Sequence, residues 1–190
     1  MFVSVDTVCY HSARSVELID YAVLERFDMA SIAEEIGVGE WTVDWLKGIG
    51  FEGFVPVHRA GASVPSVPGT YVVLREPTSD PAFALVSQGG WFKSRNPAVD
   101  VDQLAAKWVP GAQVVYIGQG GDLRRRISQL SRYGLGNPVG HWGGRYLWQL
   151  DDCADLTIAW RRDDEPTQAE ATLLSRFVAR HGRLPFANLR

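Results

Sequence analysis

Two charged side chains fall on apolar helix faces in this sequence, an arginine and a glutamate. A helix predicted over residues 123–131 places Arg126 at the edge of its apolar stripe, and a helix predicted over 166–180 places Glu170 on its buried side. An uncompensated carboxylate there would cost several kcal/mol, so Glu170 needs a metal ion, an arginine or a proton as its partner. The two residues could serve a metal ion and a phosphate, or they could form a buried ion pair that only fixes packing.

Three further residues belong to the same candidate group. Tyr71 lies on a strand predicted at 70–75, Tyr116 lies on a strand predicted at 113–118, and Asn188 stands close to the last residue. One tyrosine on a strand is usually a core or interface residue. The set is more specific than any member, because it occurs in a fixed order: Tyr71, Tyr116-Ile-Gly118, Arg126, Glu170, Asn188.

The segments Gly69-Thr-Tyr71, Tyr116-Ile-Gly118 and Asp122-Leu-Arg-Arg-Arg126 together resemble the motifs of the GIY-YIG nuclease superfamily. In that family an arginine lies eight residues after the second motif, as Arg126 does, and a glutamate and an asparagine follow, as Glu170 and Asn188 do. The resemblance covers about residues 69–190. It implies an α+β fold, in which a small, mainly antiparallel sheet is flanked by helices.

This chain departs from the family pattern at several positions. Threonine replaces isoleucine in the first motif, and an insertion at about 77–111 separates the two motifs. Gln119 stands where several members have a lysine, and Leu130 stands where a histidine or tyrosine is common. We expect Tyr133 or His141 to supply the missing group, although His141 also fits a purely structural role.

The resemblance implies hydrolysis of phosphodiester bonds with one divalent ion, Mg²⁺ or Mn²⁺, bound by Glu170 and water, which suits a hard cation. Arg126 would hold the phosphate oxygens, Tyr116 would be the general base, and Tyr71 would position the water or the phosphate. Asn188 would hold an active-site side chain or the water shell of the metal. The candidate catalytic residues are Tyr71, Tyr116, Arg126, Glu170, Asn188 and His141, and the candidate substrate-binding residues are Gly118, Gln119, Arg125 and Tyr133.

Composition and charge limit the classes to which the protein can belong. The 190 residues are 46% hydrophobic and 22% charged, which is typical of a globular protein. Two cysteines exclude a disulfide framework, and no apolar run is long enough for a membrane span. With no basic leader at the start, we expect a cytoplasmic protein. The net charge is −6 over residues 1–115 and +3 over 116–190, so phosphate recognition belongs to the second part.

We predict two regions. Residues 1–58 read as a small helical region, with helices at 15–27, 31–38 and 41–47, and a connector predicted at 50–68 crosses the boundary to the next region. Residues 59–190 read as the nuclease-like domain, with further strands at 145–150 and 156–160. The segment 29–49 fits a helix-turn-helix pattern, but Glu40 and Asp44 would repel DNA, so packing or contact with a protein partner or a second copy is favoured.

The leading hypothesis is a metal-dependent endonuclease acting on DNA, with RNA left open. The first alternative is a catalytically silent nucleic-acid-binding or adaptor protein that retains the fold, which Gln119 and Leu130 motivate. The second is a transcription regulator led by the N-terminal helices, which their acidity disfavours.

Overall fold

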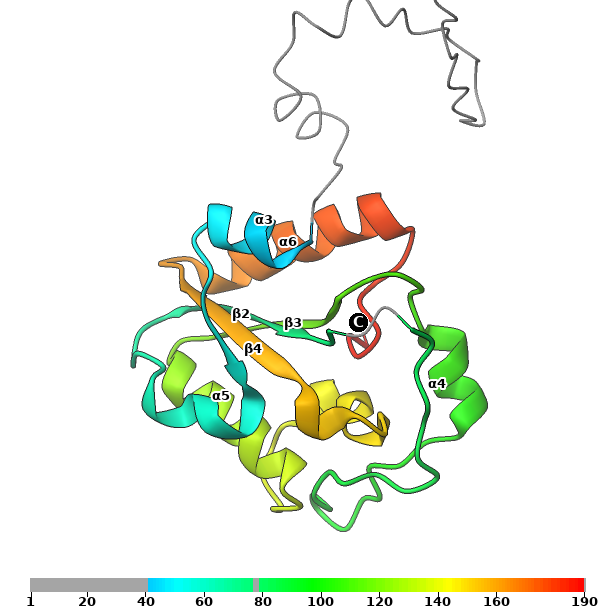
Figure 1. The fold of residues 1–190 in the computed structure, drawn as a ribbon. Helices are drawn as coiled ribbons and strands as arrows, with labels where there is room; N and C mark the ends of the chain where they lie inside the picture. Colours follow the sequence, from blue (N-terminus) through cyan, green and yellow to red (C-terminus); the bar gives the residue numbers. More distant parts are fainter. Residues whose placement is uncertain (1–40, 77–78, 190) are drawn as a thin grey trace, which may run out of the picture. The chain divides into compact units, whose positions relative to one another are not determined.

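The computed structural model describes residues 41–76 and 79–189, which fold around a four-stranded antiparallel sheet (Figure 1). Its strands, in the spatial order β1-β4-β2-β3, are β1 (Glu52–Pro56), β2 (Gly69–Leu74), β3 (Val114–Gly120) and β4 (Thr157–Arg162). The described helices are α3 (Val43–Gly48), α4 (Val101–Lys107), α5 (Leu123–Gly134), α6 (Pro166–His181) and the short 3-10 helices η1 (Val57–Ala62), η2 (Trp142–Gln149) and η3 (Cys153–Asp155). The predicted α+β class, with a small antiparallel sheet and flanking helices, is confirmed.

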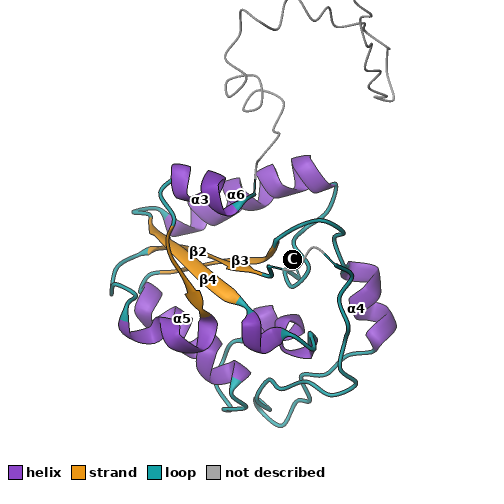
Figure 2. Cartoon of the chain, in the orientation of Figure 1, coloured by secondary structure: helices purple, strands orange, loops and turns teal. Residues whose placement is uncertain are grey.

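Helices cover both faces of the sheet (Figures 1 and 2). The helices α3 and α6 lie on one face, and α5 lies on the other with η2. Successive residues of β2 serve the two faces in turn, because Tyr71 and Val73 join the apolar cluster under α5 whereas Val72 and Leu74 join the cluster under α6. A strand buried on both faces cannot carry charge, which explains its uncharged sequence.

The predicted helix ends are confirmed where capping chemistry defines them. Asp122 caps α5, because its Oδ1 accepts a hydrogen bond from the backbone N–H of Arg125 at 3.0 Å. Pro166 is the first residue of α6. Gly182 ends that helix with φ of 74°, a conformation that favours glycine.

Two predicted segments are wrong. Residues 145–150 form most of η2 rather than a strand, because their apolar side chains are buried consecutively, not alternately. The predicted connector 50–68 contains β1 and η1, and β1 pairs with β4. On the helix predicted at 166–180, the apolar periodicity also predicts a buried Val178, but its exposed fraction is 37%.

Residues 41–58, grouped above with the N-terminal region, pack with the rest of the described chain. Trp41 is buried, with its ring 5.0 Å from that of Phe177 on α6, and Leu46 of α3 is buried in the same cluster. The described part of the helix-turn-helix pattern therefore packs on the sheet domain. The helices predicted at 15–27 and 31–38 lie outside the described residues.

The insertion at 77–111 is held by one buried glutamine of η2. The amide of Gln149 accepts from Val99 N at 2.8 Å and donates to Val99 O at 2.9 Å and Ala84 O at 3.1 Å. All three partners are backbone groups. Gln149 thus fixes both ends of the segment 84–99 on η2, and the rest of the insertion contains the short helix α4.

Asn188 joins the last described residues to β3. Its Oδ1 accepts from Ile117 N at 2.9 Å, and its Nδ2 donates to Ile117 O at 2.8 Å, while Ala187 N donates to Val115 O at 2.9 Å. Both groups of the amide are therefore occupied by the backbone of an edge strand. The expectation that Asn188 contacts a catalytic side chain or a metal-bound water is corrected: it positions the strand that carries Tyr116.

Replacement of Asn188 by alanine should lower the free energy of unfolding by about 2–4 kcal/mol, because two buried backbone groups of Ile117 lose their partner. Urea unfolding of the purified variant measures this. The control is Asn96→Ala, at an exposed residue whose amide contacts only a nearby backbone N–H, with an expected loss of about 1 kcal/mol or less. Equal losses in the two variants would contradict this role.

Candidate active site

Two tyrosines lie on the same face of the sheet because of the way β2 pairs with β3. Tyr71 is opposite Gly118 and Val73 is opposite Tyr116, so the tyrosines are diagonal neighbours on antiparallel strands. Their ring centroids are 6.0 Å apart. A Cβ atom at Gly118 would lie 2.6 Å from the hydroxyl oxygen of Tyr71. Glycine at this position is therefore what allows both rings to occupy one face.

The helix α5 positions Arg126 beside this pair. The buried side chains of Leu123, Ile127 and Leu130 fix the orientation of the helix, and Arg126 is half-buried at the edge of that stripe, as predicted. Its Nη1 donates to the carbonyl of Gly140 and to Oε1 of Gln129, each at 3.4 Å. Both hydrogen bonds are long, and no described acidic residue forms an ion pair with Arg126, so its charge is available to an anion.

Glu170 reaches the same place from the opposite face of the sheet, where α6 packs against the edge strand β3. Its carboxylate is half-buried and forms no hydrogen bond or ion pair with a described residue. Burial raises the pKa of Glu170, and the charge of Arg126 opposes the increase. The predicted alternative, an Arg126–Glu170 ion pair that only fixes packing, is not formed.

The pKa values of the two phenols show that all four groups interact. Burial raises the pKa of Tyr71 well above its ordinary value and also raises that of Tyr116. The charge of Arg126 acts in the opposite direction on both, and the charge of Glu170 adds to the increase at Tyr116. A hydrogen bond between the phenols favours ionisation of Tyr116 over that of Tyr71. Both phenols are therefore held in the protonated form, and burial acts more strongly on Tyr71 than on Tyr116.

His141 completes the group from the loop before η2. It is fully buried, its Nε2 lies 3.4 Å from the hydroxyl oxygen of Tyr71, and its ring centroid lies 6.2 Å from that of Tyr116. Burial, together with the charge of Arg126, lowers the pKa of His141 to about 3, so the imidazole is neutral. Leu130 is a core residue, and His141 is the histidine that lies against the two tyrosines.

The predicted substrate-binding residues differ in how far they are exposed. Tyr133 is wrong as a substrate contact: it is fully buried beside Gly89, and burial raises its pKa to about 12. Gln119 is half-exposed on β3, and Arg125 is exposed on α5. Gly118 is buried beneath the tyrosines, so its role is to make room for them.

Further residues border this site that had no marked motif in the sequence. Arg95 and Arg145 both lie against the Trp142 ring, at 4.8 and 4.9 Å from its centroid. The carbonyl of Gly140, which Arg126 contacts, belongs to the same stretch of chain. The sequence signal that could have found them is the lack of acidic residues around them.

Comparison with known proteins found no match: no family model, no curated protein and no solved structure resembles the chain. Among the described residues, no helix has the length and apolar character of a membrane span. The site is therefore interpreted from its own geometry.

Replacement of Gly118 by alanine should lower the free energy of unfolding by about 1–3 kcal/mol, because the added methyl group overlaps Tyr71 and Tyr116. The matched control is Gly121→Ala, where nothing lies within 4 Å of the added atom. Urea unfolding of both variants tests this. A cost at Gly121 equal to that at Gly118 would contradict the packing argument.

Buried His141 should make the fold less stable as the pH falls. The unfolded chain takes up a proton near pH 6.5, whereas the folded chain does so only near pH 3. Acidification from pH 7 to pH 5 should therefore cost about 2 kcal/mol through this residue. Chemical unfolding at both pH values should show that His141→Gln removes this loss, whereas His58→Gln, at an exposed residue, retains it. An unchanged pH dependence in His141→Gln would contradict the assignment.

Proposed function

We propose that this protein is a metal-dependent endonuclease that hydrolyses phosphodiester bonds in DNA. The observation that carries the proposal is the convergence of two tyrosines, an arginine and a carboxylate that come from four separate elements. Arg126 and Glu170 lie within electrostatic reach of each other and yet form no ion pair. Opposite charges that remain apart suit a site that binds an anion and a cation together, and phosphate with a divalent metal is such a combination.

The residues present fit a hard divalent cation. Glu170 offers one half-buried carboxylate without a described partner, and burial raises its pKa, so a cation beside it would relieve that cost. The described residues contain no group of three or more His, Cys, Asp or Glu that could hold a metal ion. Mg²⁺ commonly binds through one or two carboxylates and completes its shell with water and phosphate. When bound, such an ion would neutralise developing negative charge on the phosphate.

The other side chains of the site would have separate roles in the reaction. Arg126 would bind the non-bridging phosphate oxygens, since its fork of N–H donors matches their geometry. Tyr116 is the candidate general base, but burial raises its pKa and keeps the phenol protonated. It could accept the proton of the attacking water only after losing its own proton, which the charge of Arg126 and a cation held by Glu170 would both favour. His141, neutral and 3.4 Å from the Tyr71 hydroxyl through its Nε2, would hold that phenol in place. These roles support the GIY-YIG-type reaction expected from the motifs.

Replacement of Glu170 by glutamine should lower cleavage of plasmid or single-stranded DNA by at least about a hundredfold in the presence of Mg²⁺ or Mn²⁺. It should leave the free energy of unfolding unchanged or increase it, because burial raises the pKa of the carboxylate. The control is Glu165→Gln, at an exposed glutamate immediately before α6, which should cleave normally. Tyr116→Phe and Arg126→Lys should also lose activity.

Chelation with EDTA should abolish cleavage by the unmodified protein. Cleavage that survives EDTA would overturn the metal mechanism, and cleavage that survives in Glu170→Gln would overturn the ligand assignment. If no form of DNA or RNA is cleaved, the catalytically silent nucleic-acid-binding protein becomes the better description.

A further inference from the structure

Two segments of the chain contain basic residues and no acidic ones. Residues 81–99 and 123–150 together carry seven lysines and arginines, and neither contains an aspartate or glutamate. An average share of the 22 acidic residues of the chain would place about five in a stretch of this length. Acidic residues bound both segments on each side, at Asp80, Asp100, Asp122 and Asp151.

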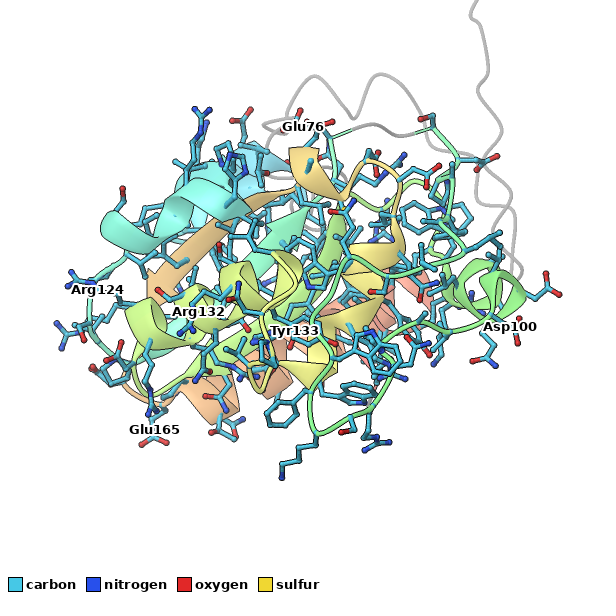
Figure 3. The ribbon with its side chains drawn as sticks, turned by 90° about the horizontal axis from the view of Figure 1, so that it is seen from below. Glu76, Asp100, Arg124, Arg132, Tyr133 and Glu165 are labelled. Atoms are coloured by element: carbon cyan, nitrogen blue, oxygen red, sulfur yellow. The ribbon has the colours of Figure 1, made fainter. Side chains whose placement is uncertain are left out.

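The fold joins these two segments. The backbone N–H of Gly90 donates to Tyr133 O, and that of Gln88 donates to Trp148 O, each at 2.9 Å. Gln149 holds the first segment through Val99 and Ala84, as described above. In Figure 3, Arg132 on α5 belongs to the second segment, and Asp100 follows the last residue of the first segment. The two residues lie on opposite sides of the view.

Basic and aromatic residues gather beside the candidate active site, where Arg95 and Arg145 contact Trp142 and Lys93 is two residues from Arg95. We define this basic rim as Lys93, Arg95, Trp142 and Arg145. The guanidinium groups of Arg95 and Arg145 stack on the Trp142 ring and leave their N–H edges available for phosphate. The rim reaches Arg126 through Gly140, whose carbonyl accepts from Arg126.

The cations of the basic rim have no acidic partner among the described residues. The ion pairs of residues 41–76 and 79–189 involve Lys47, Arg75, Arg161 and Arg162, and none involves the rim. Lys93 and Arg95 are exposed, and Arg145 is half-exposed. Unpaired cations that line the approach to a phosphate-binding arginine attract a polyanion.

A tight turn holds Lys93 at the rim. The backbone N–H of Arg95 donates to Phe92 O at 3.1 Å, and the two residues between them, Lys93 and Ser94, have φ of 51° and 58°. This is the pattern of a type I′ turn, which favours asparagine and glycine over lysine. Replacement of Lys93 by asparagine would therefore remove its charge and would also suit the positive φ at this position better.

An exposed indole stands next to this turn. Trp91 has an exposed fraction of 59%, and the neighbouring Gly90 packs against Asn137. A tryptophan face offers stacking to any unstacked base, whereas the bases of an intact duplex already stack on one another. The indole therefore favours a strand with unpaired nucleotides.

We infer that the basic rim binds the phosphates of a single-stranded stretch of nucleic acid, that Trp91 stacks on one of its bases, and that the same strand continues to Arg126 and Glu170. The inference rests on the proposed function for the identity of the site that the strand enters. It assigns the insertion 77–111 a role in holding the substrate.

Binding and cleavage are measured separately to test it. Fluorescence anisotropy with the full chain carrying Glu170→Gln compares a labelled oligothymidine with a blunt duplex of equal length, over a range of salt concentrations. Trp91→Ala should weaken binding of the single strand about 5- to 100-fold and that of the duplex less than twofold. Arg95→Ala and Arg145→Ala should weaken binding and reduce the magnitude of the salt slope by about 0.7 for each phosphate that the variant no longer neutralises.

The turn provides a control for folding. Lys93→Asn should weaken binding of the single strand without lowering the melting temperature, because asparagine tolerates positive φ. Ser94→Gly, which changes the same turn but no charge, should bind as the parent does. Lys107→Ala, at an exposed lysine of α4, should also leave binding unchanged.

The outcomes separate the two proposals. Unchanged binding in Arg95→Ala, Arg145→Ala and Lys93→Asn would overturn the basic rim, even if the unmodified protein cleaves DNA. Equal loss of single-strand and duplex binding in Trp91→Ala would overturn the role of unpaired bases. Weakened binding in the rim variants, combined with no cleavage by the unmodified protein, would support the rim and overturn the proposed function.

Discussion

Tyr71 and Tyr116 can occupy the same face of the sheet because the residue opposite Tyr71 is Gly118, which has no side chain. The rest of the candidate site depends on this pairing. It requires β3 to keep its register against β2, and Asn188 holds β3 from the other side through the backbone of Ile117. Once β3 is fixed, the capped start of α5 brings Arg126 to the tyrosines.

The unpaired charges of the site lower the stability of the fold and favour the binding of charged ligands. Burial raises the pKa of both tyrosines and of Glu170, and it lowers that of His141, so each group is held away from its charged form. Arg126 and Glu170 would relieve each other as an ion pair, but their elements keep them apart. An arrangement of this kind favours ligands that carry the missing charges, and it suits a phosphodiester bound together with a cation.

The elements that could be predicted from the sequence are those with a local chemical signal. Asp122, Pro166 and Gly182 mark helix ends by capping, and the apolar stripe of α5 placed Arg126 at its edge. The segment 145–150 could not be predicted, because an apolar run has the same appearance in a strand and in a buried 3-10 helix. Tyr133 and His141 were equal candidates in the sequence, and only the long-range packing of η2 against the sheet places His141 at Tyr71. Stacking of Arg95 and Arg145 on Trp142 likewise depends on contacts between distant segments.

The hydrogen bonds from Gln149 to the insertion have a wider consequence. Its amide recognises only main-chain atoms of Ala84 and Val99, so it is indifferent to the side chains between them. Substitutions along that stretch can therefore accumulate without moving it, except at Gly89 and Gly90, where an added Cβ would collide with Tyr133 and Asn137. The fold thus combines a fixed anchor, Gln149, with a surface between Ala84 and Val99 whose side chains can change. This arrangement allows one scaffold to acquire new targets, in evolution or by grafting in the laboratory.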